Sequence, residues 1–596
     1  MRKGVLEALQ DAKEPALPLL IAPTGYGKTS AVHYSWRGML REWGRVVHVL
    51  PLRALVSDVA SKAVERGVPP HLVSYQAMLR EVRVKVGGEE LQLRKSPYML
   101  SPYVAVTYDS YLLSFYVAPV AELTRFHTHR DLGLLAAAGG GVIFDEAHLA
   151  LAIDSLGGPG GRAAGASAGD EGQVLLQEES KAFTALVTTI ELLKQHLGRP
   201  VLVMTATLQR EVVQWLSCEL KRRGVHACLH VCLGRRGLTY FENSAHSVKP
   251  HGLDEEYSSL YEDYRKVAKT RVSKEPVEEE VRKALDHSRT VLVFCNTVLR
   301  AAEVYRALKN KVDAEIRLLH GRMGEQHREK ILSEVEELLE SERPFVLVST
   351  QCLEAGVDLD FDTVVTEVAP PGSLIQRAGR AIRNLERRLE REGGPRAQVV
   401  VCLDEKSVES AASVYPRGAV EAVARDLSVG EYFFDWRFAE GEPSFVDLLA
   451  RHEIIPKLDK NIENNLKTLL QIRVLHQPSV KNLLEELDRH AEGSLLRDSA
   501  LIPLAVQSGG SDGYDVVPVS LNFLKRRGRD VLVLKSESTE ALAVFEDRTT
   551  GRVKLWNLLE RPLSTLYELR AQKGEGADLV GLLVKEGVYD PEVGLV

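Results

Sequence analysis

One short segment has the residue types and spacing of a phosphate-binding loop. It follows an apolar run directly and reads Ala22, Pro23, Thr24, Gly25, Tyr26, Gly27, Lys28, Thr29 and Ser30. Its two glycines let backbone amides curl around phosphate oxygens, and the helix that should follow directs its positive end at the anion. The lysine would neutralise the β and γ phosphates of ATP, and the Thr29 hydroxyl would bind Mg²⁺. We expect all nine residues to contact the nucleotide, although the general pattern begins with Gly where this chain has Ala22.

A second apolar run ends in two adjacent carboxylates. Asp145 and Glu146 follow the run Gly141–Phe144, and His148 comes two residues later. An acidic side chain at such a strand end holds Mg²⁺, and its neighbour polarises the attacking water. We assign Asp145 to the metal and Glu146 to the water. His148 should face either the nucleotide or the groups that couple its hydrolysis to motion.

Two small hydroxyl residues follow a third apolar run. Thr205 and Thr207 stand just after Val201–Met204. Their hydroxyls could hydrogen-bond the acidic motif and report the state of the nucleotide. The triplet is a weak signal alone and gains weight only beside the other two motifs.

Such groups need strands that end at one edge of a parallel sheet. The first half has five apolar runs of strand length, separated by helical patterns, and this rhythm restarts near residue 291. Strands that alternate with helices predict two tandem α/β lobes. The predicted strands are Leu17–Ala22, Val46–Leu50, Tyr103–Thr107, Gly141–Asp145 and Pro200–Thr205, then Val291–Cys295, Ile316–His320, Phe345–Ser349, Thr363–Val368 and Gln398–Leu403.

The remaining segments suggest the domain limits. We predict a first lobe at 1–240, a charged linker at 241–285, a second lobe at 286–410 and a mixed, largely helical C-terminal domain at 411–596. Within the last, Pro443–Leu495 looks mainly helical, whereas Leu501–Val517 and Asp530–Trp556 look like short strands. Gly157–Gly172 is rich in Gly and Ala and predicts a loop.

Composition narrows the class of protein. The 596 residues carry a net charge of −7, so any binding to nucleic acid must be local and sensitive to salt. No apolar run approaches the roughly 18 residues of a membrane span, and the N-terminal residues do not resemble a signal peptide. The six cysteines form no CxxC pair. We therefore expect a cytoplasmic protein with reduced thiols, and the scarcity of Met and Asn hints at a thermophile.

Taken together, these motifs resemble those of superfamily-2 helicases. Leu374–Arg383 resembles the last helicase motif, QRxGRxxR, in which arginines of the second lobe reach the γ-phosphate bound on the first. The resemblance implies two RecA-like lobes of the P-loop NTPase fold and a nucleic-acid strand as substrate. It makes Arg380 and Arg383 the phosphate-reaching pair and Gln376 a residue that places the water. It also assigns Gly356 and Asp358 to the nucleotide, and Arg53, Thr107 and Thr350 to strand phosphates.

The sequences of these motifs resemble those of the CRISPR-associated helicase of type I interference systems. The similarity rests on Asp145–His148, Gln351–Asp362, Thr366–Gly372 and Gln376–Arg380, and it covers roughly residues 1–405. It implies an ATP-dependent motor that moves along single-stranded DNA in the 3′-to-5′ direction. In that family an RNA-guided surveillance complex recruits the helicase, and a histidine–aspartate (HD) nuclease cuts the strand.

The nuclease part of that family has no counterpart in this sequence. None of the 17 histidines is followed by Asp, and the phosphate loop begins near residue 22. A separate nuclease subunit, as in the archaeal type I-A arrangement, is the expectation. The only local His/Asp cluster, His127 and His129 with Asp131, is a weak candidate metal site. Gln10 is the only upstream candidate for a glutamine that reads adenine.

Two other functions stay open at this stage. A general DNA-repair or RNA helicase of the same superfamily would carry the same hydrolytic residues. An ATP-gated clamp that grips nucleic acid without travelling would need fewer of them.

Overall fold

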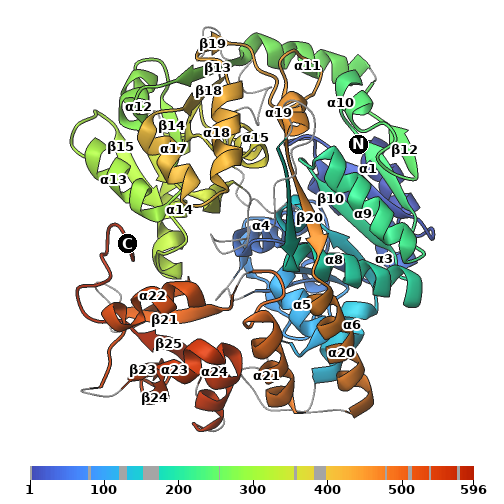
Figure 1. Cartoon of the computed structure of the whole chain (residues 1–596), viewed down its shortest axis with the longest axis vertical. Coiled ribbons are helices and arrows are strands. Elements are labelled where there is room, and N and C mark those ends of the chain that lie inside the picture. Colours follow the sequence, from blue (N-terminus) through green and yellow to red (C-terminus); the bar gives the residue numbers. More distant parts are fainter. Residues whose placement is uncertain are drawn as a thin grey trace.

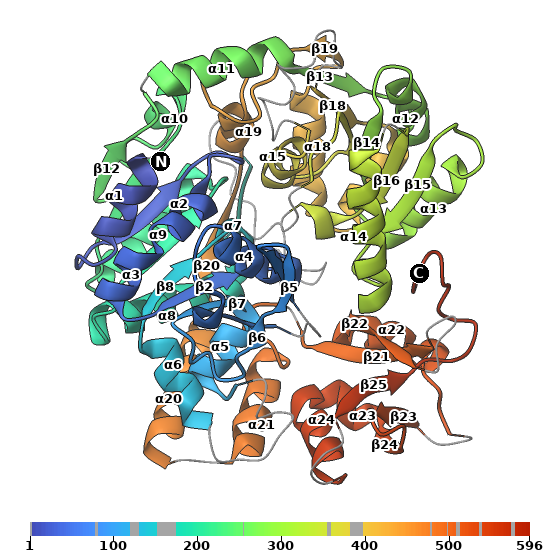
Figure 2. The same cartoon turned by 180° about the vertical axis from the view of Figure 1, so that it is seen from behind.

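The chain folds into three parts. The structure is a computed structural model that describes residues 3–77, 82–119, 130–151, 174–253, 255–341, 343–354, 359–381, 397–476, 479–497, 499–507, 513–535, 539–573 and 578–596. Two α/β lobes stand next to each other, and a C-terminal region lies against both of them (Figure 1). The reverse view in Figure 2 shows the same three parts.

The first lobe is built on a nine-stranded sheet in which every neighbouring pair is parallel. Most of its strands are fully buried, as expected for a parallel sheet covered on both faces. In sheet order the strands are β12 (Ser247–Pro250), β11 (Ala227–Val231), β1 (Leu17–Ile21), β10 (Val201–Thr205), β8 (Gly141–Phe144), β2 (Val46–Leu50), β7 (Tyr103–Thr107), β3 (Val73–Gln76) and β6 (Arg94–Lys95).

Helices connect these strands and cover the sheet. They are α1 (Lys3–Asp11), α2 (Lys28–Tyr34), α3 (Trp36–Trp43), α4 (Arg53–Glu65), α5 (Tyr108–Tyr116), α6 (Arg130–Ala138), α7 (His148–Leu151), α8 (Lys181–Glu191), α9 (Arg210–Arg222) and α10 (Arg235–Tyr240). A small antiparallel hairpin, β4 (Arg83–Val86) and β5 (Glu89–Gln92), stands apart from the main sheet.

The second lobe repeats the plan with seven strands. In sheet order these are β15 (Glu315–Leu319), β16 (Phe345–Ser349), β14 (Thr290–Phe294), β17 (Thr363–Glu367), β18 (Ala397–Cys402), β13 (Ala268–Ser273) and β19 (Gly430–Tyr432), of which only β19 runs antiparallel to its neighbour. Its helices are α12 (Val277–Leu285), α13 (Val298–Leu308), α14 (Glu325–Glu340), α15 (Pro371–Ala378), α17 (Glu405–Ala412) and α18 (Arg417–Asp426). The helix α11 (Glu255–Val267) bridges the two lobes (Figure 1).

The C-terminal region contacts lobe 1 first and then forms a domain with its own core. Its strand β20 (His452–Leu458) pairs in parallel with β9 (Val174–Ser180), a strand from the first half of the chain. The helices are α19 (Phe445–Arg451), α20 (Lys460–His476), α21 (Val480–Ala491), α22 (Leu521–Val531), α23 (Leu555–Glu560) and α24 (Pro562–Ala571). The final sheet contains, in order, β22 (Tyr514–Ser520), β21 (Leu501–Gln507), β25 (Leu579–Leu583), β23 (Glu540–Phe545) and β24 (Thr550–Lys554), over a separate apolar cluster.

The predicted fold class and all ten predicted strands are confirmed, each to within one residue at either end. The segment 241–285 is not a separate linker, because β12 within it joins the first sheet while β13 joins the second. The second sheet also continues past residue 410, since β19 pairs with β13. Gly157–Gly172 lies outside the described residues. Among the described helices, none is long and apolar enough to cross a membrane.

Candidate active site

The order of strands in the first sheet brings three of the predicted motifs together. Strand β10 lies between β1 and β8, so the segments that follow all three strands emerge side by side at the carboxyl edge. Backbone hydrogen bonds continue beyond the strands: Ala22 N donates to Thr205 O at 3.1 Å, and Ala147 N donates to Met204 O at 3.0 Å. The phosphate loop, the hydroxyl pair and the acidic pair therefore form one continuous surface.

The phosphate loop has the backbone that its glycines permit. Gly27 caps the start of α2 with φ +90°, a conformation that a side chain would strain, and Gly25 has φ +71°. Lys28 is only 6% exposed, and its Nζ donates to the carbonyl oxygens of Ala22 at 3.0 Å and Pro23 at 3.4 Å. The buried ammonium is thus held over the loop by two carbonyls.

Asp145 is buried at the meeting point of this loop and strand β2. Its Oδ2 accepts hydrogen bonds from Thr29 Oγ1 at 3.3 Å and from His48 Nε2 at 3.1 Å. His48 Nδ1 in turn lies 2.8 Å from the Tyr103 hydroxyl. Burial alone would raise the pKa of the Asp145 carboxyl, but the contact with His48 and the charge of Lys28 hold that pKa below its usual value. Asp145 is therefore an anion at neutral pH.

Glu146 and His148 lie next to each other, beside the hydroxyl pair. Glu146 has φ +48°, uncommon for a residue with a side chain, and its N–H donates to Asp145 Oδ1 at 2.9 Å. His148 Nδ1 lies 3.4 Å from Glu146 Oε2 and 3.1 Å from Thr205 Oγ1. Burial and the nearby Lys28 charge lower the pKa of His148 to about 3, so the ring is neutral. Strained backbone of this kind is concentrated at functional sites.

The second lobe adds residues of α15 and of the turn after it. Gln376 Nε2 donates to Thr207 Oγ1 at 3.3 Å across the lobe interface. The backbone at Gly379 approaches the loop so closely that a Cβ there would stand 2.9 Å from Thr24 Oγ1. Arg380 is 6% exposed, and its Nη2 donates to the carbonyl oxygen of Glu354 at 2.9 Å. The arginine therefore has a fixed position at the same interface.

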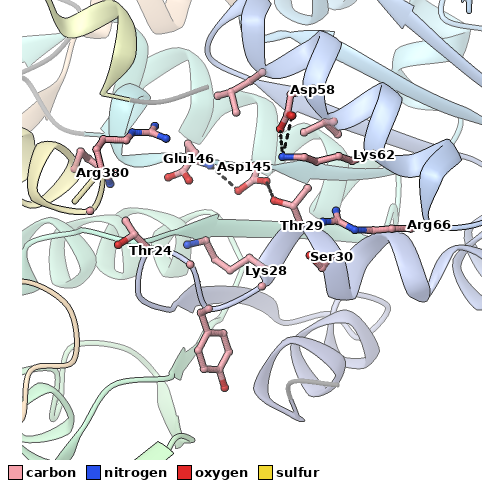
Figure 3. A pocket seen from close by; sticks show the side chains of 17 residues that line it. Thr24, Lys28, Thr29, Ser30, Asp58, Lys62, Arg66, Asp145, Glu146 and Arg380 are labelled. Atoms are coloured by element: carbon pink, nitrogen blue, oxygen red, sulfur yellow. Dashed lines mark hydrogen bonds and ion pairs between the residues drawn. The ribbon is translucent and has the colours of Figure 1, made fainter. Parts of the chain in front are cut away.

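These groups surround one cavity of about 290 Å³. Figure 3 shows Lys28, Thr29 and Asp145 on one side and Arg380 entering from the second lobe. The cavity is lined from lobe 1 by Thr24, Gly25, Tyr26, Gly27, Lys28, Thr29, Ser30, Leu55, Asp58, Val59, Lys62, Arg66, Asp145 and Glu146, and from lobe 2 by Gln376, Gly379 and Arg380. A polyanion would meet four cations here, Lys28, Lys62, Arg66 and Arg380, beside three carboxylates that can bind a metal or a water.

Comparison with known proteins shows which families this chain resembles. Residues 5–155 match the model of the DEAD/DEAH box helicase family, and residues 287–386 match that of the CRISPR-associated nuclease/helicase Cas3, C-terminal. A Cas3 nuclease/helicase of Methanothermobacter thermautotrophicus is 26% identical over 382 residues, which are 62% of this chain and 39% of that protein. In both matched regions the chain is similar to Cas3 helicases.

Two further Cas3 proteins are similar over most of the chain. The helicase Cas3 of Thermoproteus tenax is 22% identical, over 71% of this chain and 62% of its own. The ADP-bound crystal structure of Cas3 from T. fusca has a TM-score of 0.53 at 18% identity, and covers 87% of this chain and 64% of that one. At this level of identity the structural match supports the fold alone. The chain spans about two fifths of the Methanothermobacter relative's length.

Most of the predicted residues of the candidate site lie together. Lys28, Thr29, Asp145, Glu146, Gln376 and Arg380 all line the cavity, while Thr205, Thr207 and His148 form the layer behind it. Ala22 and Pro23 contribute carbonyl oxygens to Lys28 instead of lining the cavity. Gly356, Asp358 and Arg383 lie outside the described residues, as do His127 and His129. Gln10 is an exposed residue of α1 and does not line the cavity.

Of the three residues expected to contact a strand, two have side-chain partners within the chain and the third is buried. Arg53 Nη1 donates to Glu325 Oε1 of the second lobe at 2.5 Å. Thr107 caps α5, since its Oγ1 accepts from Ser110 N at 3.3 Å. Thr350 is buried at the start of a short 3₁₀ turn, Gln351–Leu353. Their role in binding a strand stays a prediction.

Several residues of the candidate site were not predicted from the sequence. Asp58, Lys62 and Arg66 line the cavity from α4 or just past its end, and Lys62 Nζ lies 2.8 Å from Asp58 Oδ1. Their spacing of four residues places them on one helix face, a signal that the sequence does contain. Glu354 is a second omission: it accepts from Arg377 Nε at 2.7 Å and from Arg380 through its carbonyl.

Proposed function

We propose that this chain is an ATP-dependent motor that moves along single-stranded DNA in the 3′-to-5′ direction and unwinds target DNA in type I CRISPR interference. The observation that carries the proposal is the cavity between the lobes. Lys28, Asp145 and Glu146 enter it from lobe 1, and Gln376 and Arg380 enter it from lobe 2. A ligand that contacts both sets must respond to any relative movement of the lobes.

ATP fits this cavity by charge and by hydrogen bonding. Backbone amides of the loop and the Lys28 ammonium would hold the β and γ phosphates, and Lys28 would exchange its contacts with Ala22 O and Pro23 O for phosphate oxygens. The oxygens of Thr29 and Asp145 stand 3.3 Å apart, and hard oxygen groups of this kind suit Mg²⁺. When bound, Mg²⁺ would neutralise charge on the phosphates.

Glu146 and the lobe-2 residues are then placed for hydrolysis. The Glu146 carboxylate would orient and polarise the attacking water, and its Oε2 lies 3.4 Å from His148 Nδ1. Arg380 and Arg383 would stabilise charge on the γ-phosphate in the transition state, while Gln376 would help to place the water. Because the two arginines and Gln376 belong to lobe 2, loss of the γ-phosphate would weaken the closed arrangement of the lobes.

The strand would bind through its phosphates and not through its bases. Arg53, Thr107 and Thr350 are the residues we propose for these contacts, two on lobe 1 and one on lobe 2. Contacts to phosphate carry no sequence information, which suits a motor that steps over any base. Alternating grip by the two lobes would move the strand as ATP is bound and hydrolysed.

The proposed role in CRISPR interference rests on the resemblance to Cas3 helicases. We propose that an RNA-guided surveillance complex recruits this helicase and that a separate HD nuclease subunit cuts the strand. Adjacent His and Asp residues are the metal-ligand pair of that nuclease. The 596 residues contain no His followed by Asp, and we propose that the pair belongs to the nuclease subunit. Direction of movement also rests on the family resemblance.

A strand-displacement assay tests the proposal. Duplexes with a 3′ DNA overhang, a 5′ DNA overhang or a 3′ RNA overhang are incubated with ATP and Mg²⁺, with Glu146→Gln as the variant that keeps the shape of the site. We expect displacement only from the 3′ DNA overhang, and none by the variant. Displacement from RNA alone would favour a general RNA helicase. ATP-dependent binding without displacement would favour a clamp.

A further inference from the structure

A second cluster of ligand-type side chains lies away from the cavity, at the edge of the first sheet. Helix α1 packs there beside β11 and β12, near the N-terminus (Figure 1). It contributes Glu7 and Asp11, while His230 comes from β11 and His251 follows β12. Two groups of potential metal ligands occur in the described part of the chain, Glu7–His230–His251 and Asp11–Cys228–His230, and they share His230.

The distances within the first group match those between ligands of one zinc ion. His230 Nδ1 lies 3.1 Å from His251 Nε2, and His251 Nε2 lies 3.9 Å from Glu7 Oε2. Two nitrogens at a Zn–N distance of about 2.0–2.1 Å in a tetrahedron stand about 3.3 Å apart. Glu7 is half-buried, so its carboxylate has room to close the remaining gap.

The surroundings of His230 orient its ring for metal binding. His230 is fully buried, and its Nε2 donates to Asp11 Oδ2 at 2.9 Å, which leaves the lone pair on Nδ1 facing His251. A carboxylate on the far nitrogen of a ligating histidine is the usual outer partner of such sites.

Lys249 decides between the two groups. Its Nζ lies 2.6 Å from Asp11 Oδ2, so a divalent cation on the Asp11–Cys228 side would meet an ammonium. On the other side, Lys3 Nζ stands 3.8 Å from Glu7 Oε1, but the Lys3 side chain is 84% exposed and can move away. Because Lys249 pairs with Asp11, a ligand of the second group, we take Glu7–His230–His251 as the candidate site.

A glycine in α1 allows the helix to lie close to His251. A Cβ on Gly4 would stand 2.9 Å from His251 Cγ and 2.5 Å from Cys232 Sγ, so only glycine allows α1 to lie so near the histidine. Three separate segments thus converge on one point.

We propose that Glu7, His230 and His251 bind one Zn²⁺, with water in the fourth position and Asp11 orienting His230. The ion joins α1, the helix that leads into β1 and the phosphate loop, to the edge strand β12 and its neighbour β11. Zinc then stabilises the N-terminal part of lobe 1. The site is separate from the nucleotide cavity, since none of these three residues lines it.

The test is zinc content and affinity of the full chain. The protein is stripped with a chelator, reloaded with Zn²⁺ in excess Mg²⁺ to block the nucleotide cavity, desalted and measured by mass spectrometry of the metal. We expect one zinc per wild-type chain, and none in His251→Ala or Glu7→Gln. Asp11→Asn should retain the site with an affinity lower by about 10–100-fold, the usual effect of losing an outer partner.

A matched control uses another histidine pair. His226 and His246 are both exposed, with ring centroids 4.7 Å apart, and have no carboxylate partner among the described residues. His226→Ala should keep its zinc and the thermal shift that zinc produces in the wild type. Unchanged circular dichroism of Glu7→Gln would show that it still folds. Wild-type protein that retains no zinc, or a His251→Ala variant that retains as much as His226→Ala, would overturn the proposal.

Discussion

The Gln376 amide of the second lobe donates a hydrogen bond to the Thr207 hydroxyl of the first at 3.3 Å. Thr207 N in turn donates to Thr205 Oγ1, which lies 3.1 Å from His148 Nδ1. A chain of contacts therefore runs from α15 to the acidic pair that faces the nucleotide cavity. Through it, the position of lobe 2 can affect the residue proposed to orient the water.

The first prediction concerns this chain of contacts. Gln376→Ala and Thr207→Val should each lower kcat for ATP hydrolysis and leave ATP affinity within about threefold, because Lys28 and the loop are untouched. If the Gln376–Thr207 contact acts as a unit, kcat of the double variant should fall no further than kcat of the more strongly affected single variant. The coupling energy should then be about 0.5–3 kcal/mol. Steady-state kinetics of the four proteins measures it, and fully additive losses would contradict the coupling.

A second prediction concerns the ion pair between lobes, Arg53–Glu325, at 2.5 Å. If Arg53 contacts strand phosphate, Glu325 competes with that phosphate. Glu325→Gln should then tighten binding of single-stranded DNA severalfold. Arg53→Gln should weaken it and reduce the slope of log affinity against log salt concentration by about one. Fluorescence anisotropy at several salt concentrations measures both. Equal affinities of the two variants for single-stranded DNA would show that Arg53 does not contact the strand.

A third prediction concerns the stability of lobe 2. Arg377 is fully buried and donates to Glu354 Oε1 at 2.7 Å, Thr366 Oγ1 at 3.0 Å and Asn296 Oδ1 at 2.9 Å. Arg377→Met leaves a buried carboxylate without its cation and should cost about 3–5 kcal/mol in the free energy of unfolding. Chemical denaturation measures the loss.

Two control variants sharpen that experiment. Arg282→Ala, which removes a surface pair with Glu279, should cost less than about 1 kcal/mol. Adding Glu354→Gln to Arg377→Met should restore part of the stability, since it removes the uncompensated charge. A loss in Arg377→Met no larger than in Arg282→Ala would contradict the role of the buried pair.

A fourth prediction concerns pH. His320 is fully buried, its Nε2–H donates to Val593 O at 2.9 Å, and its Nδ1 accepts from Arg322 N at 3.1 Å, so the ring is neutral. Burial lowers the pKa of His320 from 6.5 to about 4. The folded pKa lies below the unfolded one, so the stabilisation is complete above pH 6.5 and is lost as pH falls towards 4.

The expected size follows from proton linkage. Between pH 6.5 and 4 this one histidine should contribute a slope of about 1.4 kcal/mol per pH unit to the free energy of unfolding. His320→Asn keeps an acceptor for Arg322 N and should reduce the slope of the whole protein by about that amount. Denaturant unfolding at a series of pH values measures it, and an unchanged slope would show that His320 takes up a proton in the folded chain.

Much of the geometry of the candidate site was predictable because it follows short buried strands. Apolar runs such as Val46–Leu50 and Phe345–Ser349 are strands with those same limits, since burial on both faces leaves a continuous signal. Lys28, Asp145 and Arg380 follow from motifs at the ends of such elements. What the motifs do not contain is the partner of each group, such as His48 on the neighbouring strand.

Contacts between distant segments could not be predicted. Strand β9 pairs with β20, about 280 residues later, and the charged segment 241–285 contributes strands to both sheets. Periodicity reports which residues are buried and not which segments meet. The Glu7–His230–His251 cluster was missed for this reason, because its ligands come from three separate segments.

The central claim is that the cavity between the lobes hydrolyses ATP in response to a DNA strand. The most direct measurement is ATP turnover with no nucleic acid, with single-stranded DNA and with single-stranded RNA, for the wild type and for Lys28→Ala. The account predicts strong stimulation by DNA in the wild type and turnover at background in the variant. Wild-type turnover in Lys28→Ala, or stimulation by RNA alone, would contradict it.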